Sequence, residues 1–264
     1  MSPMNNRLLV PRKTPGLLDL VPGAAAAYSL RSLSRSYADP VVTVRRSSDN
    51  DEAPFTASEV ADGTLAAFCG AGDGLVTKWW DQSGNANHAS QSTPGLQPKL
   101  VDAGVVILEE GKPAVQWTGS NEVLVISSSV AASSAFLVLT SLNVGTTAYI
   151  TDNDQSGYMS DTPGLVRYRQ GGTNYNHSVP VAQSQLLLSG IIAASNTLSI
   201  YGNGAVSPES PDTTTGIVGL SHIGYRTNGG WSLNGYIQEI VLYTSDQTAN
   251  RELLEGQIAW SFSV

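Results

Sequence analysis

Cysteine is nearly absent from this chain, because Cys69 is the only one among 264 residues. A single thiol cannot form an intramolecular disulfide, which excludes the small disulfide-stapled scaffolds of secreted proteins. Cys69 ends the apolar run Leu65–Cys69, and no histidine stands near it in the sequence. We therefore expect a buried, unreactive thiol and not a catalytic nucleophile.

Charge is also scarce. Charged residues make up 14% of the chain, below the roughly 25% of ordinary soluble domains. There are 14 Lys and Arg against 22 Asp and Glu, so the net charge is −8. A general nucleic-acid binder needs a basic surface to displace counterions, so we expect no nucleic-acid partner. A surface poor in charge and rich in Ser, Thr, Asn and Gly suits contact with glycans or with other subunits.

Long hydrophobic runs are missing as well. No segment reaches the roughly 18 apolar residues of a membrane span, so we expect no membrane insertion. Basic residues occur near the start of the chain, but Pro11, Pro15 and Pro22 interrupt any apolar core of a signal peptide. These features predict a protein that is made and folded in a reducing cytoplasm.

No zinc-binding spacing is present, because the three histidines are scattered along the chain. Asp152 and Asp154 alternate with other oxygen-bearing residues, as the ligands of a calcium loop do. However, Pro163 stands where the closing glutamate of an EF-hand would be. A plain polar turn is the favoured interpretation, so we expect no cofactor, with calcium at Asp152 and Asp154 as the alternative.

Residues 1–23 differ from the rest of the chain. Their prolines forbid regular helix and favour an extended conformation, yet the segment is too apolar for a free tail. We expect an arm that docks onto a neighbour or onto the parent domain, residues 24–264. The candidate docking residues are Leu8, Leu9, Val10, Leu17 and Leu18.

The segment Ala24–Tyr37 is rich in alanine and leucine and predicts a helix, as do Thr64–Cys69 and 246–261. From Val76 onward, short β-prone segments alternate with clusters of Gly, Pro, Asn and Asp. This punctuation is typical of a β-sandwich or jelly roll. The strand candidates include Val76–Trp80, Ser134–Leu142, Gln185–Ala193 and Gly235–Tyr243.

The run Trp79–His88 is the most informative stretch. Two aromatic rings end a β-prone segment, and small polar residues that favour tight turns follow. Rings stack on sugars while amides and carboxylates bind hydroxyl groups, so the run fits a carbohydrate site or a structural corner. The candidate sugar-binding residues are Trp80, Asp81, Asn85 and Asn87, together with Tyr225 and Trp231 in later polar loops.

Two segments, and the opening of the domain with them, carry a resemblance to one family. Trp80–His88 is similar to the Tyr-Asp-Gln-Ser-Gly-Asn-Gly-Asn-His of the catalytic domain of fungal B-type α-L-arabinofuranosidases. Gly235–Tyr243, with its Gly-x-Ile-x-Glu pattern, resembles the closing strand of concanavalin A-like lectin/glucanase domains. The segment from Ala27 to Asp49 resembles the opening of the same domain, and also bacteriophage virion and tail proteins that carry it. The resemblance implies an all-β concanavalin A-like jelly-roll sandwich with a few short helices and an extended N-terminal arm.

The resemblance also implies where catalytic carboxylates would stand. The family's nucleophile is a Glu after a Gly-His-Met-like stretch, and the nearest match here, Gly157–Met159, is followed by Ser160. Its acid/base Asp follows a Gly-Ile-Gly-Gly-like stretch, and the nearest match, Ile223–Tyr225, is followed by Arg226. Because retaining glycosidases need two carboxyl groups about 5–5.5 Å apart, these replacements predict a protein without catalytic residues.

We therefore expect a non-catalytic structural protein of a bacteriophage virion, on the tail or decorating the head, made in the host cytoplasm. The arm would bind other virion proteins, and the symmetry of the particle would make the protein a homo-oligomer, with a trimer as one form. One alternative is a receptor-recognition protein that binds a cell-surface glycan. The other is an arabinofuranosidase-like glycosidase, in which Asp161, next to Ser160, is the candidate acid.

Overall fold

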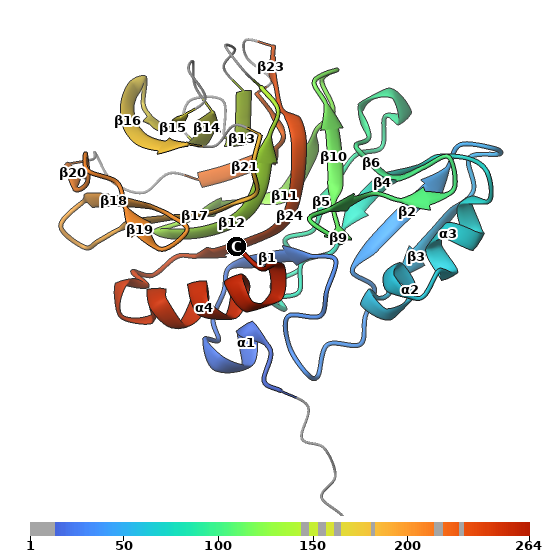
Figure 1. Ribbon diagram of the computed structural model, residues 1–264, viewed down its shortest axis with the longest axis horizontal. Coiled ribbons are helices and arrows are strands. Elements are labelled where there is room, and N and C mark those ends of the chain that lie inside the picture. The colour runs from blue at the N-terminus through green and yellow to red at the C-terminus, as the bar shows by residue number, and fades with distance from the viewer. Residues whose placement is uncertain are drawn as a thin grey trace, which may run out of the picture.

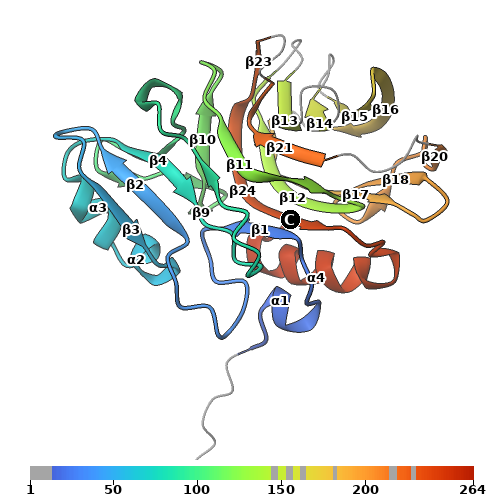
Figure 2. The same cartoon turned by 180° about the vertical axis from the view of Figure 1, so that it is seen from behind.

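Antiparallel strands in two layers form most of the molecule (Figures 1 and 2). The predicted all-β sandwich with a few short helices is confirmed. The computed structural model describes residues 14–264 apart from 144–147, 153–156, 161–164, 181–182, 214–218 and 227–229.

The first layer is a continuous run of antiparallel pairs. Its strands alternate, with apolar side chains turned toward the second layer and polar ones toward solvent. In spatial order the strands are β3 (Glu52–Phe55), β2 (Val42–Arg46), β4 (Gly74–Trp79), β5 (Ala89–Ser90), β11 (Leu124–Ala131), β21 (Gly219–Ile223), β13 (Ala148–Asp152), β14 (Gly157–Ser160), β15 (Leu165–Gln170) and β16 (Thr173–Pro180).

The second layer is built around the last strand of the chain, β24, which pairs with β12 on one edge and with β10 and β1 on the other. β6 pairs with both β10 and β4 and so joins the two layers. The strands of this layer and its margins are β24 (Asn234–Tyr243), β12 (Ser134–Ser141), β10 (Val115–Thr118), β1 (Ala26–Ser29), β6 (Lys99–Asp102), β7 (Val105–Val106), β17 (Leu186–Ile192), β18 (Thr197–Gly202), β19 (Ala205–Val206) and β20 (Asp212–Thr213).

The core has two parts, one on each face of the second layer. Leu137 and Leu139 of β12 point into the cluster between the layers. Phe136 and Val138 point the other way, into a cluster covered by the helices α1 (Leu17–Leu20) and α4 (Arg251–Phe262) (Figure 1). Because β12 is covered on both faces, its sequence is an unbroken apolar run without the alternation of a half-exposed strand.

The remaining helices are short. α2 (Ala57–Ala61) begins at a capping box, in which the Thr56 N–H donates to Glu59 Oε2 at 2.8 Å and the Thr56 hydroxyl accepts from the Glu59 N–H. α3 (Thr64–Cys69) has the predicted bounds, and burial raises the pKa of the Cys69 thiol. None of the described helices is long and apolar enough to cross a bilayer. Two 3₁₀ turns complete the set, η1 (Pro94–Leu96) and η2 (Thr248–Asn250).

The prediction of a helix over Ala24–Tyr37 is wrong. The chain instead forms β1 and then irregular structure, because β1 pairs with β24 in register from Ala26↔Leu242 to Ser29↔Glu239. The Ala27 N–H donates to the Asp81 carboxylate at 2.8 Å. These long-range contacts outweigh the helix propensity of four alanines, which is only a few tenths of a kcal/mol per residue, on the order of 0.5.

The described part of the predicted arm packs on its own domain. Leu17 is buried against α4, Leu18 is half-buried, and the Leu18 N–H donates to Leu33 O at 2.9 Å. Leu8, Leu9 and Val10 lie outside the described residues. Docking of the arm onto another subunit stays a prediction.

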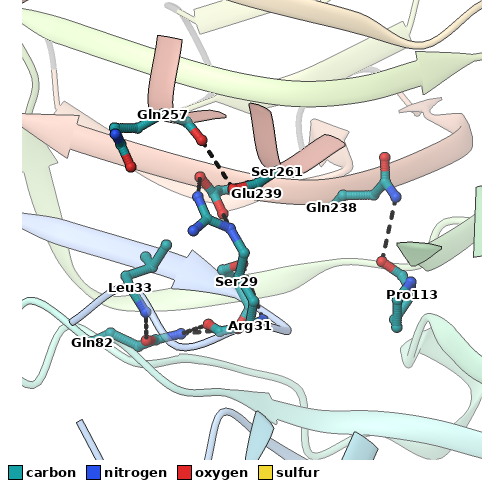
Figure 3. Close-up of polar contacts among 9 residues, drawn as sticks. All are labelled: Ser29, Arg31, Leu33, Gln82, Pro113, Gln238, Glu239, Gln257 and Ser261. Atoms are coloured by element: carbon teal, nitrogen blue, oxygen red, sulfur yellow. Dashed lines mark hydrogen bonds and ion pairs between the residues drawn. The ribbon is translucent and has the colours of Figure 1, made fainter. Parts of the chain in front are cut away.

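A buried ion pair joins the start of the chain to its last strand (Figure 3). The Arg31 guanidinium donates from two nitrogens to the two Glu239 oxygens, each at 2.8 Å, and the Glu239 side chain is fully buried. Gln82 holds the backbone around Arg31: its oxygen accepts from the Leu33 N–H at 2.9 Å, and its amide donates to Ser29 O and Arg31 O at 3.0 and 2.9 Å.

We expect Arg31→Met to lower the free energy of unfolding by about 3 kcal/mol, because the buried Glu239 carboxylate loses its cation. Urea unfolding measures this. Arg46→Met is the matched control, since both arginine side chains are 29% exposed but the Arg46 partners Asp49 and Asp51 are 52% and 62% exposed. Exposed pairs contribute less than about 1 kcal/mol. Equal losses in the two variants would contradict the argument.

His177 of β16 is buried among polar groups. Its Nδ1 lies 3.3 Å from Ser207 Oγ and its Nε2 lies 3.4 Å from Asp212 Oδ2. Burial lowers the pKa of His177 despite the opposing effects of Asp212 and Glu209. The folded protein therefore holds this imidazole neutral at pH values where the unfolded chain protonates it.

Acidification from pH 7 to 5.5 should lower the free energy of unfolding through His177, because the lowered pKa makes the folded state bind the proton less readily than the unfolded state. Denaturant unfolding across the pH range measures the slope, which we expect to be shallower in His177→Gln. Burial lowers the pKa of His88 too, so His88→Gln is measured in parallel. The pKa of Glu209 is about 2, outside the window. A slope that His177→Gln leaves unchanged would refute the assignment.

Candidate functional site

The Asp81 carboxylate organises the loop after β4. Oδ1 accepts from the Ala27 and Ser83 N–H groups at 2.8 and 2.9 Å, and Oδ2 accepts from Ser83 Oγ and the Asn87 N–H at 2.7 and 3.0 Å. Asp81 is 4% exposed. The carboxylate therefore holds the loop closed and fixes it to β1.

The neighbouring predicted sugar-binding residues lie in the same loop. The Asn85 side-chain amide donates to Ala24 O and Ala25 O at 2.9 and 3.2 Å, and that of Asn87 donates to Ala25 O at 2.9 Å. The structure thus brings Asp81, Asn85 and Asn87 together, with both amides bonded to the chain before β1, while the Trp80 ring packs against His88, Lys78 and Thr43. Sugar binding by these four residues stays a prediction.

If Asp81 is a structural group, Asp81→Asn should lower the free energy of unfolding by about 2 kcal/mol, the contribution of hydrogen bonds to a buried charge. Thermal and urea unfolding measure the change. Asn85→Ala is the comparison, because Asn85 is exposed and we expect a loss below about 1 kcal/mol from neutral hydrogen bonds. An Asp81→Asn protein as stable as the wild type would show that the carboxylate does not hold the corner.

Tyr225 and Trp231 lie apart from that loop, in the hairpin formed by β22 (Tyr225–Arg226) and β23 (Trp231–Ser232). The Arg226 guanidinium lies over the Trp231 ring, 4.7 Å from its centroid, and Trp231 is 37% exposed. The hairpin begins at Gly224, whose φ of +86° and closeness to Trp117 (a Cβ would lie 2.0 Å from Nε1) both require glycine.

A buried carboxylate, Glu122, stands beside this hairpin. Thr118 Oγ1 and the Ser120 N–H (2.9 Å) donate to it. The preceding residue fixes the turn to β23, because the Asn121 N–H donates to Ser232 Oγ at 2.9 Å. Sequence reasoning missed Glu122, since the only local signal is a carboxylate after a Thr-Gly-Ser-Asn turn, and its partner strand lies more than 100 residues later.

The positions that the resemblance matches to catalytic carboxylates lie on either side of β13. Ser160 pairs with Ala148 on one edge, and on the other edge the Gly224 N–H donates to Ile150 O at 2.9 Å, two residues before Arg226. Ser160 is fully buried, with its hydroxyl 3.3 Å from Ser141 Oγ. β13, β14 and β23 lie at the same end of the sandwich (Figure 1). Ser160 belongs to β14, Arg226 pairs with Trp231 of β23, and the turn that carries Glu122 is bonded to Ser232 of β23.

Glu122 differs from the other buried acids of the described chain. Glu239 is paired with Arg31 and Glu255 with Arg251, while Asp81 fastens backbone groups. Glu122 is held by neutral donors, and the described residues place no cation in ion-pair contact with it. Within the described residues it is thus a carboxylate without a charge partner, in a turn that is bonded to β23 through Asn121 and Ser232.

The described residues form no metal-binding site. Within the part of the chain that the structure describes, no three His, Cys, Asp or Glu side chains gather as metal ligands would. Asp154 lies outside the described residues, as do the side chain of Asp152 and the acid Asp161.

Comparison with known proteins identifies the family. The model of the catalytic domain of α-L-arabinofuranosidase B matches residues 19–162, more than half of the chain. The chain belongs to this family, as its resemblance predicted.

Curated relatives match over a shorter stretch. α-L-Arabinofuranosidase B of Penicillium canescens is 42% identical over 78 residues, which are 28% of this chain and 17% of the relative. A probable α-L-arabinofuranosidase B of Aspergillus fumigatus is 40% identical over 78 residues, which are 28% of this chain and 15% of the relative. The matched segments thus span less than a fifth of those relatives.

Solved structures agree on the fold. A GH54 α-L-arabinofuranosidase soaked with 4-nitrophenyl α-L-arabinofuranoside matches 89% of this chain and 62% of its own, with a TM-score of 0.62 and 15% identity. An arabinofuranosidase complexed with arabinofuranosyl-α-1,2-xylobiose covers the same shares with a TM-score of 0.59 and 17% identity.

These findings correct the main functional prediction. We predicted a non-catalytic bacteriophage virion protein that is located in the particle. The chain instead belongs to a family of arabinofuranosidase catalytic domains with fungal relatives, which contradicts that prediction. The prediction failed because it took two loosely aligned positions, Ser160 and Arg226, as proof that the chemistry was lost. Binding to other subunits and the oligomeric state stay predictions.

Proposed function

We propose that this chain is a glycosidase that hydrolyses α-L-arabinofuranosides. The observation that carries the proposal is the family match over residues 19–162. The substrate follows from the names of the relatives and from the arabinofuranosides bound to two similar structures. The site is the end of the sandwich that holds Glu122, Ser160 and the β22–β23 hairpin.

Glycoside hydrolysis needs carboxyl groups as nucleophile and as general acid/base. We assign one of these roles to Glu122. Its buried side chain is held by Thr118 and Ser120 in a fixed orientation, and it carries no cation that would have to be displaced before reaction. The two positions that the resemblance matches to the family's carboxylates hold Ser160 and Arg226, whose hydroxyl and guanidinium groups cannot act as the nucleophile or acid of this mechanism.

The remaining groups at this end suit a small neutral sugar. Trp231 presents a partly exposed ring edge to solvent, and Arg226 is fixed against it. Ser141 and Ser160 are fully buried, so their hydroxyl groups help to shape this end from inside the fold and do not face solvent. A ring for stacking and several donors that converge on one region are the usual elements of a ligand site.

We expect the protein to release 4-nitrophenol from 4-nitrophenyl α-L-arabinofuranoside, and Glu122→Gln to lower kcat/KM by about 10²–10⁴-fold, the range for loss of a catalytic proton-transfer group. Absorbance of the released phenolate measures both. Glu110→Gln is the matched control, because Glu110 is an exposed glutamate on a turn and we expect no change.

The two parts of the proposal fail separately. Absence of turnover by the folded wild-type protein would overturn the function. Normal turnover by a folded Glu122→Gln protein would leave the function in place and overturn the role of Glu122. Thermal unfolding of each variant shows that it is folded.

A further inference from the structure

A polar cleft lies on the solvent side of the first layer, away from the β22–β23 hairpin. Its volume is about 490 Å³, within the 300–1,000 Å³ or so of ligand sites. Strands β2, β4, β5 and β11 form its floor, where Thr43 pairs with Lys78, Lys78 with Ser90, and Ser90 with Val125. Nothing in the proposed hydrolysis uses these residues.

Lys78 is held in place within this cleft. Its ammonium lies 4.5 Å from the centroid of the Trp80 ring, and the Trp80 ring is itself fixed by a 2.9 Å hydrogen bond from Nε1 to Thr43 Oγ1. Among the described residues, no carboxylate forms an ion pair with Lys78. A fixed cation with unused donors is therefore directed at the cleft.

An acceptor faces the same space. Glu52 is exposed and accepts from Thr77 Oγ1 at 3.1 Å, which orients its carboxylate and leaves most of its lone pairs free. Ser90 adds an exposed hydroxyl group. Val125, 39% exposed, supplies an apolar surface beside Ser90, at the opposite edge of the cleft from Glu52.

We propose that this cleft binds a neutral saccharide, as a site separate from the hydrolytic one. One cation and one carboxylate that do not pair with each other can bind adjacent hydroxyl groups: Lys78 donates to one oxygen while Glu52 accepts a proton from the next. Because the two charges cancel, the cleft favours an uncharged ligand over an anionic one. The C–H face of the sugar ring would lie on Val125.

Affinity electrophoresis in native gels tests binding as a readout separate from hydrolysis. The probes are unsubstituted xylan and mixed-linkage β-glucan, neutral polysaccharides without arabinofuranosyl groups, and polygalacturonate as the anionic one. We expect a neutral polysaccharide to retard the wild-type protein, and Lys78→Met with Glu52→Gln to weaken that binding at least tenfold. Lys112→Met with Glu110→Gln is the control, since both residues are exposed and lie outside this cleft.

Retardation that the Lys78/Glu52 double variant retains in full would overturn the site, as would binding of polygalacturonate alone or of none of the probes. Unfolding temperatures show that the variants are folded. Hydrolysis of 4-nitrophenyl α-L-arabinofuranoside is measured on the same variants, because it reports on the proposed hydrolytic site and not on this cleft. Loss of aryl arabinofuranoside hydrolysis and loss of retardation are therefore separate results.

Discussion

The Glu239 carboxylate is the constraint on which the rest of the architecture depends. It is fully buried in the central strand of the second layer, where an unpaired charge would cost several kcal/mol. Arg31 neutralises it, and Arg31 reaches it only because Gln82 fixes the backbone from Ser29 to Leu33. Segments far apart in the chain thus have to meet at one point, and β1, β4 and β24 are aligned as a result.

This network gives the two recognisable motifs of the sequence a physical meaning. The Asp-Gln-Ser-Gly-Asn run and the Gly-x-Ile-x-Glu run are both parts of it, because Asp81 holds β1, Gln82 holds the segment after β1, and Glu239 binds Arg31. The residues that identify the family are therefore those that position its strands. The proposed catalytic residue, Glu122, belongs to neither motif, and a resemblance carried by structural motifs gives little information on such a residue.

The sandwich could be predicted because its signals are local. The apolar run of β12 predicts a strand that is buried on both faces, and the residues of α3 predict its bounds. The segment Ala24–Tyr37 could not be predicted, since its strand exists through pairing with residues over 200 positions later. Glu122 could not be singled out from the sequence either, because its environment also depends on residues far along the chain. Its significance comes from the Asn121–Ser232 contact, which no spacing within the turn indicates.

The central place of β24 has a consequence for how the chain folds. This strand is synthesised after every strand that it joins. Among the described strands β1 pairs with β24 alone, while β10 and β12 have β6 and β17 on one edge and need β24 on the other. The early strands therefore leave the ribosome with open edges that are covered only after most of the polypeptide has been made. Such non-local topology folds slowly and exposes edges to aggregation in the meantime. N-terminal fragments that lack β24 are consequently not expected to fold on their own. We also expect the full chain to depend on chaperones during its synthesis.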